Sequence, residues 1–133
     1  MSRIASDGAP RALGPYAQAV AAGDLLFCSG QVGIDPGSGA LVPGGIASET
    51  ARVLENLAAV LRAAGLGLGD VVKTTVYLTD LSEFAAMNEV YGRYFPPPCP
   101  ARATVQVAKL PAGARIEVEA VATRGRRAAA TES

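Results

Sequence analysis

The sequence contains no histidine and no tryptophan, and only two of its 133 residues are cysteines. Without histidine, the chain lacks the Ser-His and Cys-His pairs that activate enzyme nucleophiles, and it lacks the usual zinc ligands. Any proton transfer must then run through aspartate, glutamate, tyrosine, lysine, cysteine or water. The two cysteines, Cys28 and Cys99, do not suggest a disulfide-stapled domain.

The sequence also lacks an excess of charge, since 12 Lys and Arg residues balance 12 Asp and Glu residues. A chain with zero formal net charge has no basic field to hold a phosphate backbone, so nucleic-acid binding is not expected. No apolar run approaches the roughly eighteen residues of a membrane span, and the first residues have no apolar signal core. We therefore expect a cytoplasmic protein that does not enter a membrane.

The composition favours one folded domain. Hydrophobic residues make up 50% of the chain and charged residues 18%, which suffices for a core and argues against disorder. The length is close to the commonest single-domain size. We expect one domain over residues 1–125 and a disordered tail over residues 126–133.

Apolar alternation and helical spacing predict the secondary structure. Strands are expected at 17–23, 25–32, 71–80, about 101–109 and about 115–124, and helices at 49–65 and 81–95. Gly23-Asp24 would turn the first strand pair, and Ser48 and Gly65 would cap the two ends of the first helix. The first sixteen residues and residues 33–45 are rich in glycine and proline, so we expect loops there.

Asp80 and Glu83 have the spacing of a capping box at the start of the second helix, and Pro96-Pro97-Pro98 would end it. Each helix should bury one face: Ala51, Leu54, Leu57, Ala58 and Leu61 in the first, and Phe84, Met87, Tyr91 and Phe95 in the second. The expected order is ββαβαββ, an α+β fold. Two helices are too few to cover both faces of the sheet, so one face would be left for another subunit.

Several motifs are weak functional signals. GLGLGD at 65–70 resembles a phosphate loop, but it follows a helix and precedes a strand, so we interpret it as a connector. Glu117 and Glu119 share a strand face roughly 6–7 Å apart, as a glycosidase pair could. Without a tryptophan platform, solvated strand charges are the simpler interpretation. Cys28 is typical of a core cysteine, and Cys99 lies in a proline-rich loop where it would be exposed.

Arg102 and Glu117 are charged residues within strands that otherwise predict half-buried sheet. Alternation places Arg102, Thr104 and Gln106 on one face of their strand, opposite its apolar residues. A guanidinium at the mouth of a strand can hold a planar carboxylate through two parallel hydrogen bonds. Two interpretations stay open here: solvated strand residues, or a carboxylate clamp with an acid–base group.

The spacing of the two residues constrains how they could cooperate. If the last two strands form a hairpin around residues 111–113, Glu117 faces about residue 107. Arg102 then lies about 16 Å further along. If another strand intervenes, the two are separated sideways as well. One chain does not easily bring them together, so a shared small substrate would require a subunit interface.

Four separated blocks carry a resemblance to a known family. They are DGAPRALGPYAQAV (7–20), SGQVGIDPGSG (29–39), VVKTTVYLTDLSEFAAMNEVY (71–91) and PARATVQVAKLPAGARIEVEAVA (100–122). In this order and spacing, the chain resembles the Rid family, also called the YjgF family, from about Ile4 to Arg124. The resemblance implies a chorismate mutase-like fold and a homotrimer whose sheets form a central barrel, with clefts between subunits.

The resemblance also implies an activity and its site. The activity is hydrolysis of enamines and imines, such as 2-aminoacrylate and its tautomer 2-iminopropanoate, to 2-oxo acids and ammonia, without a metal or other cofactor. Arg102 of PAR would bind the substrate carboxylate, and Glu117, the first acid of IEVE, would activate water. The remaining substrate-site residues would be Tyr16 of GPY, Ser29 and Gly30 of SGQ, Asn88 and Thr104.

Two features depart from the family pattern, and a second function stays open. Some bacterial members carry a cysteine at the place of Thr104, and the short loop FPPPCPAR would alter the mouth of the cleft. Some members are described as translation inhibitors, chaperone-like proteins or ligand-sensing subunits, so a non-catalytic binder of carboxylate metabolites is the alternative. A ribonuclease, also claimed in the family, is disfavoured by zero net charge and the absence of histidine.

Overall fold

The computed structural model describes residues 1–125, and the tail expected at 126–133 lies outside the described residues. The strands are β1 (Ser2–Ile4), β2 (Ala19–Ala22), β3 (Leu25–Val32), β4 (Val71–Leu78), β5 (Ala101–Gln106) and β6 (Ile116–Thr123). The helices are α1 (Gly45–Ala63) and α2 (Phe84–Tyr94), with single 3-10 turns at Leu68–Asp70, Leu81–Glu83 and Pro111–Gly113.

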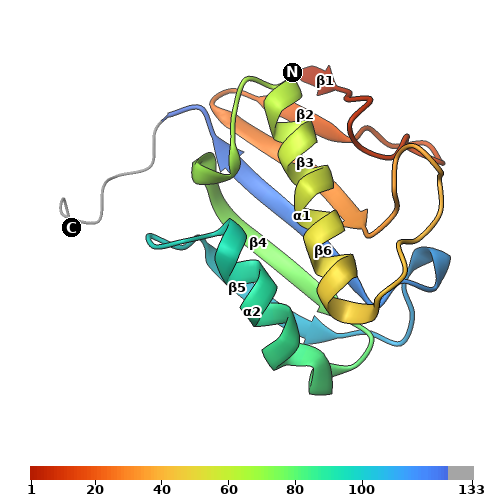
Figure 1. Cartoon of the computed structure of the whole chain (residues 1–133). Coiled ribbons are helices and arrows are strands. Elements are labelled where there is room, and N and C mark those ends of the chain that lie inside the picture. Colours follow the sequence, from red (N-terminus) through yellow and green to blue (C-terminus); the bar gives the residue numbers. More distant parts are fainter. Residues whose placement is uncertain (126–133) are drawn as a thin grey trace.

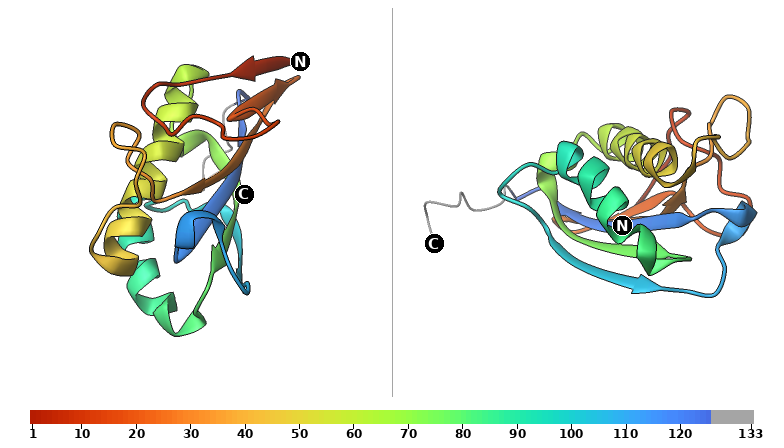
Figure 2. Two further views of the ribbon diagram at one scale, coloured as in Figure 1. Left: turned by 90° about the vertical axis from the view of Figure 1, so that its right-hand side faces the viewer. Right: turned by 60° about the horizontal axis from the view of Figure 1, so that its bottom comes forward.

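The described strands form one sheet in the order β1-β2-β3-β6-β4-β5. The sheet is mixed, because β5 pairs parallel to β4 while the other neighbours are antiparallel. Both helices lie on the same face of the sheet, as Figures 1 and 2 show. The predicted α+β class and one-sided helical layer are confirmed.

The N-terminal segment contains a strand that the sequence did not predict. Residues 2–4 pair antiparallel with β2, with Arg3 opposite Val20. Three residues are too few for an alternating pattern to be recognised, and the pairing depends on the neighbouring hairpin rather than on local sequence. The element order is therefore βββαβαββ rather than ββαβαββ.

The start of α1 also differs from the prediction, whereas its end agrees. Gly44, with φ of 109°, turns the chain into the helix, so Ser48 lies inside the first turn and does not cap it. Gly65 adopts φ of 78°, and the Leu66 N–H donates to the Leu61 carbonyl at 2.9 Å. A left-handed glycine of this kind closes the last turn of a helix.

The capping box expected before the second helix is only half formed. The Asp80 side chain accepts a hydrogen bond from the Ser82 N–H at 2.9 Å. The Glu83 side chain instead accepts from Arg115 Nη1 at 3.1 Å, so it does not return to the backbone. The first turn is a 3-10 turn, and α2 begins at Phe84.

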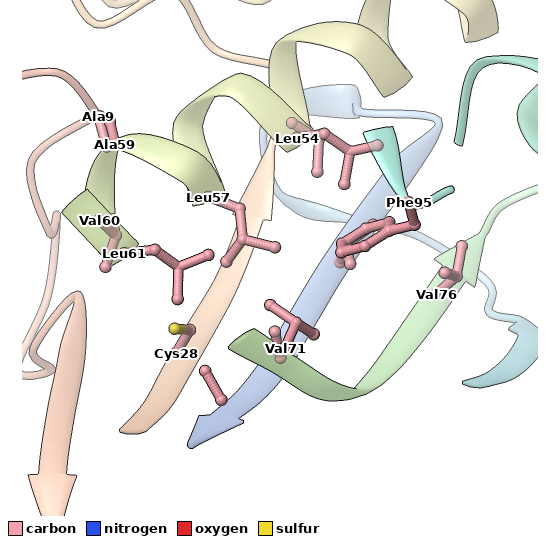
Figure 3. Packing of buried hydrophobic residues seen from close by; sticks show 14 of the residues in the cluster. Ala9, Cys28, Leu54, Leu57, Ala59, Val60, Leu61, Val71, Val76 and Phe95 are labelled. Atoms are coloured by element: carbon pink, nitrogen blue, oxygen red, sulfur yellow. The ribbon is translucent and has the colours of Figure 1, made fainter. Parts of the chain in front are cut away.

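The core lies between α1, α2 and the sheet. Leu57 and Leu61 of α1 point into it toward Cys28 and Val71, and Leu54 lies on the side of Phe95, as Figure 3 shows; all three leucines are fully buried. The rest of the buried face of α1 differs from the prediction. Val53 and Val60 are fully buried, whereas Ala51 and Ala58 are only partly buried.

The other face of the sheet carries no helix (Figure 2). Alternation directs Leu25, Phe27 and Val105 toward this open face, where their exposed fractions are 40%, 46% and 42%. Leu25 and Phe27 lie together on β3 and Val105 lies on the edge strand β5, and exposed apolar side chains of this size favour a surface that another protein covers.

Candidate active site

Arg102 projects from β5 toward the helical layer. Its guanidinium lies over the ring of Tyr91, 4.8 Å from the ring centre, and over the ring of Phe84 at 5.5 Å. Among residues 1–125, none of the ion pairs includes Arg102. The rings hold the flat cation in place and leave its N–H fork without a carboxylate, which is the state of an anion-binding arginine.

A cavity of about 330 Å³ opens beside Arg102, and Asn88, Tyr91 and Cys99 contribute to its lining. Thr104 follows Arg102 by two positions on the same strand face. Its Oγ1 is buried and has no hydrogen-bond partner among the described residues. An unpaired buried hydroxyl costs free energy, so a ligand in reach of Thr104 would find a free donor and acceptor.

Tyr91, which sequence analysis assigned only to the core, also lies against Arg102. Its Oη shares a hydrogen bond of 2.7 Å with Thr74 Oγ1. Burial raises the pKa of Tyr91, so the phenol stays neutral against the guanidinium. A helical position four residues before Phe95 suggests a packing residue, and nothing in the sequence indicates that the same ring supports Arg102.

Glu117 lies on the opposite face of the sheet, directly beside Gly30. A β-carbon at position 30 would meet Glu117 Cδ at 2.7 Å and Cγ at 3.0 Å. The pairing of β3 with β6 shifts register between Cys28 and Gln31, and this bulge contains Gly30. A bulge re-aims side chains next to functional sites, and here it opens the space that the Glu117 carboxylate fills.

Glu117 lines a second cavity of about 330 Å³, together with Tyr16 and Gly30. Burial, and after it the charge of Glu119, raise the pKa of Glu117. No hydrogen bond to the Glu117 carboxylate is formed within residues 1–125. A desolvated carboxylate without donors is a good proton acceptor, as a general base must be.

The N-terminal segment that carries Tyr16 is fastened by Gln18, which sequence analysis did not single out. Gln18 is buried, its Oε1 accepts from Ser6 N at 2.6 Å, and its Nε2 donates to the Pro10 carbonyl at 2.8 Å. The Ser29 hydroxyl donates to the Ala17 carbonyl at 2.6 Å. Ser29 therefore supports the segment that contains Tyr16, and it does not line the Glu117 cavity.

The two halves of the candidate site do not meet within one chain. β4 lies between β5 and β6, so the hairpin considered from sequence does not form. Arg102 pairs with Thr74 and Glu117 with Tyr77. Two strand spacings and three residues separate the two α-carbons by about 14 Å. Their side chains also lie on opposite faces, and of the two arrangements considered from the sequence, the one with an intervening strand is present.

The cysteines and carboxylates elsewhere do not form a rival site. Burial raises the pKa of Cys28 to about 12, so this thiol is unreactive core, as predicted. Cys99 is exposed, as expected. Within residues 1–125, no three cysteine or acidic side chains gather in a way that could hold a metal ion. In the same range, neither helix has the length and apolar character needed to cross a bilayer.

Comparisons with known proteins match this arrangement to a family. A sequence model of the family described as "Endoribonuclease L-PSP" matches residues 6–124. The chain belongs to the Rid family. Among curated relatives, this Rid chain is 51% identical to the mouse protein named 2-iminobutanoate/2-iminopropanoate deaminase over 92% of its own length and 90% of the relative's. The human protein of the same name is also 51% identical, covering 92% and 89%.

Solved structures of Rid relatives have the same fold. A Thermotoga maritima protein described as a putative endoribonuclease superposes with a TM-score of 0.90 at 51% identity, covering 92% of this chain and 97% of that one. The structure of TdcF from E. coli, determined with bound serine, superposes with a TM-score of 0.89 at 41% identity, covering 94% and 100%.

Proposed function

We propose that this Rid protein hydrolyses reactive imines of small 2-amino acids, of the 2-iminopropanoate and 2-iminobutanoate type, to 2-oxo acids and ammonia. The observation that carries the proposal is the Arg102 guanidinium, seated on two rings beside a cavity without a carboxylate partner among residues 1–125. The 51% identity to mammalian proteins named as deaminases of this kind supports it. The serine bound to TdcF is likewise a small molecule with a carboxylate.

The active site requires a second copy of the chain. Arg102 and Glu117 lie on opposite faces of one sheet, so a substrate held by one reaches the other only across an interface. The apolar side chains on the open sheet face favour self-association. The assembly we propose is the homotrimer of the family, with its open sheet faces packed into a central barrel and a cleft between each pair of subunits.

The reaction divides between the two halves. Arg102 binds the substrate carboxylate with two parallel hydrogen bonds and fixes the imine carbon near Glu117 of the neighbouring subunit. Glu117 takes a proton from a water molecule while the water oxygen adds to the carbon of the C=N bond, which gives a tetrahedral carbinolamine. Glu117 passes that proton to the nitrogen, and the C–N bond then breaks as the hydroxyl oxygen forms the carbonyl; the hydroxyl proton goes to the departing ammonia, which leaves as NH₄⁺. The balance is CH₃–C(=NH₂⁺)–COO⁻ plus H₂O to CH₃–CO–COO⁻ plus NH₄⁺.

The remaining predicted residues take supporting roles in this scheme. Tyr16 and Gly30 line the cavity of Glu117, whereas Asn88 lines the cavity of Arg102 and Thr104 lies beside that arginine. Tyr16 would donate a hydrogen bond to the substrate, and Thr104 would use its unpaired hydroxyl. Ser29 would act through the segment that it holds rather than by contact with the substrate.

The test follows 2-iminopropanoate released in solution by an amino-acid oxidase, with and without the protein. Arg102→Ala should remove the acceleration, and Arg102→Lys, which keeps the charge but not the fork, should restore little of it. Glu117→Ala should slow the reaction by about 10²- to 10⁴-fold while the oligomer stays intact. Full activity in both alanine variants would refute the assignment.

Two alternative functions, a non-catalytic carboxylate sensor and a ribonuclease, would give different results in these assays. A non-catalytic carboxylate sensor would bind 2-oxo acids through Arg102 and leave the imine decay unchanged. Ribonuclease activity, suggested by the description of the family, would require RNA cleavage at physiological salt. The zero net charge of the chain disfavours this activity. The preferred imine side chain would be read from relative rates over a panel of imines made by the same oxidase.

A further inference from the structure

A second acid and a tyrosine flank Glu117 on the open face of the sheet. Glu119 follows Glu117 by two positions on β6, so both side chains project to the same face. Tyr77 of β4 is the direct cross-strand partner of Glu117, yet its Oη donates a hydrogen bond to Glu119 Oε1. The phenol therefore runs diagonally across the strand pair, beside both carboxylates.

We propose that Tyr77 and Glu119 are a positioning pair for Glu117: their mutual hydrogen bond fixes a negative charge beside this carboxylate and makes Glu117 a stronger proton acceptor. The inference rests on the proposed function, in which Glu117 removes a proton from water. It adds two residues that need not touch the substrate and that control how readily the base accepts its proton.

The electrostatics of the three groups agree with this geometry. The hydrogen bond to Glu119 raises the pKa of Tyr77 to about 12, so the phenol remains a donor at every pH at which the protein would be assayed. Two carboxylates on one strand face disfavour simultaneous ionisation. After burial, the charge of Glu119 is the second cause that raises the pKa of Glu117.

The other groups that face Glu117 do not provide the same effect. β3 contributes Gly30 and Gln31 to its cavity, neither of which titrates. The N-terminal segment contributes Arg11 and Tyr16 to the same lining. Glu119 does not line this cavity; it lies two positions along the same face of β6, where Tyr77 is bonded to it and where its charge raises the pKa of Glu117 after burial.

A purely structural role would predict a different response to substitution. The Tyr77–Glu119 hydrogen bond is exposed and joins neighbouring strands that their backbone ladder already holds together. The bond lies on the sheet face that the proposed trimer packs, so a purely structural role would lower the stability of the chain or of the trimer and leave the pH dependence of catalysis in place. A change in proton affinity, in contrast, moves the pH dependence of catalysis.

The experiment measures kcat/KM for imine hydrolysis from pH 4 to 9 in wild type, Glu119→Gln and Tyr77→Phe. Glu119→Gln keeps the side-chain shape and removes the charge, so its acid limb should move to lower pH. We expect a loss of less than about tenfold at the alkaline plateau, and this loss should shrink as the pH falls. Tyr77→Phe frees Glu119 to turn away, so it should move the limb in the same direction by a smaller amount.

A matched control comes from another tyrosine–glutamate pair in the same chain. Tyr94 Oη donates to Glu55 Oε2 at 2.9 Å on the helical side of the molecule. Glu55→Gln and Tyr94→Phe remove the same charge and the same kind of hydrogen bond far from Glu117. Both should leave the pH profile in place.

A second readout separates this inference from the proposed function. Carboxyl NMR of Glu117 reports its titration midpoint without any substrate, and Glu119→Gln should lower that midpoint. An unchanged midpoint would overturn the inference, whatever the kinetics. A lowered midpoint with an unmoved acid limb would overturn the role of Glu117 as the base, and with it the catalytic part of the inference. If the titration midpoint of Glu117 and the acid limb of kcat/KM both move to lower pH, the result supports the inference and the role of Glu117 as the base.

Discussion

The carboxylate of Glu117 occupies the space into which a side chain at position 30 would project. The clash involves only the end of the glutamate side chain, so a methyl group at Gly30 would displace the carboxylate and leave the backbone in place. We predict that Gly30→Ala lowers imine hydrolysis by about 10- to 100-fold, because small misplacements of a catalytic group have effects of that size. Thermal unfolding should stay near that of wild type.

Gly67→Ala is the control for this prediction. A β-carbon at Gly67 meets nothing within 4 Å, and the residue lies outside both cavities of the proposed site. Its activity and stability should match wild type. Normal hydrolysis by Gly30→Ala would mean that the position of Glu117 does not matter to the reaction.

The ionised Glu117 carboxylate should destabilise the folded state at neutral pH, and protonation of this carboxylate should remove the effect. Burial, and then Glu119, raise its pKa, so the folded state binds this proton more tightly than the unfolded chain does. The stabilisation by protonation is fully present below the unfolded pKa and is lost as the pH rises through the folded pKa. Glu117→Gln should therefore have a higher Tm than wild type at pH 7, while catalysis is lost.

Thermal unfolding between pH 4 and 8 checks this sign. The Tm difference between Glu117→Gln and wild type should shrink on acidification and disappear once Glu117 is protonated in both states. A variant that is less stable at neutral pH, with a difference independent of pH, would contradict the assignment of a raised pKa to this site.

The rings around Arg102 predict an effect on substrate binding. Phe84 lies 5.5 Å from the guanidinium and is 39% exposed, so its contribution belongs to the weaker class of cation–π contacts. Such a contact is worth about 0.5–1 kcal/mol, which corresponds to a two- to fivefold rise in KM for Phe84→Ala. Phe84→Tyr keeps a ring face and should keep the KM. An increase confined to Phe84→Tyr would exclude a cation–π role.

The residue before β6, Arg115, is held by a buried carboxylate of α1. Glu49 is 3% exposed, and its Oε1 accepts from the Arg115 N–H at 2.8 Å. Glu49→Ala leaves that backbone N–H without its partner and should lower the free energy of unfolding by about 1–3 kcal/mol. Arg93→Ala, which breaks the exposed ion pair with Glu89, should have little measurable effect in the same denaturant titration.

Much of the local structure could be predicted from the sequence, whereas the roles of Arg102 and Glu117 follow from the family resemblance and stay predictions. The bounds of β3 follow from its apolar run between Gly23-Asp24 and the glycine-rich loop. Arg102 and Glu117 are noticeable as charges inside alternating strands, but Glu119 fits the same pattern, so the alternation alone does not separate site residues from solvated ones. Gly30 of the SGQ block lies where β3 leaves space for the Glu117 side chain. The sequence indicates this glycine, but only the structure shows that Glu117 is the residue beside it.

The arrangement of β5 could not be predicted from local pattern. Its parallel pairing with β4 depends on the crossover through α2, which is a tertiary choice. Alternation separated Arg102 and Thr104 from the apolar residues of β5 without showing which face meets the helices; Val105 is 42% exposed, while Arg102 and Thr104 are partly buried. The rings of α2 cover the Arg102 side of the strand, and no local rule places Tyr91 over Arg102.

The shared site between subunits is tested most directly by mixing two inactive variants. Arg102→Ala and Glu117→Ala would be co-expressed with different affinity tags, and oligomers carrying both tags would be isolated. In a mixed trimer, one interface joins an intact Arg102 to an intact Glu117, so about a third of the wild-type kcat should return. Mixed trimers as inactive as either parent would contradict a site built from two chains.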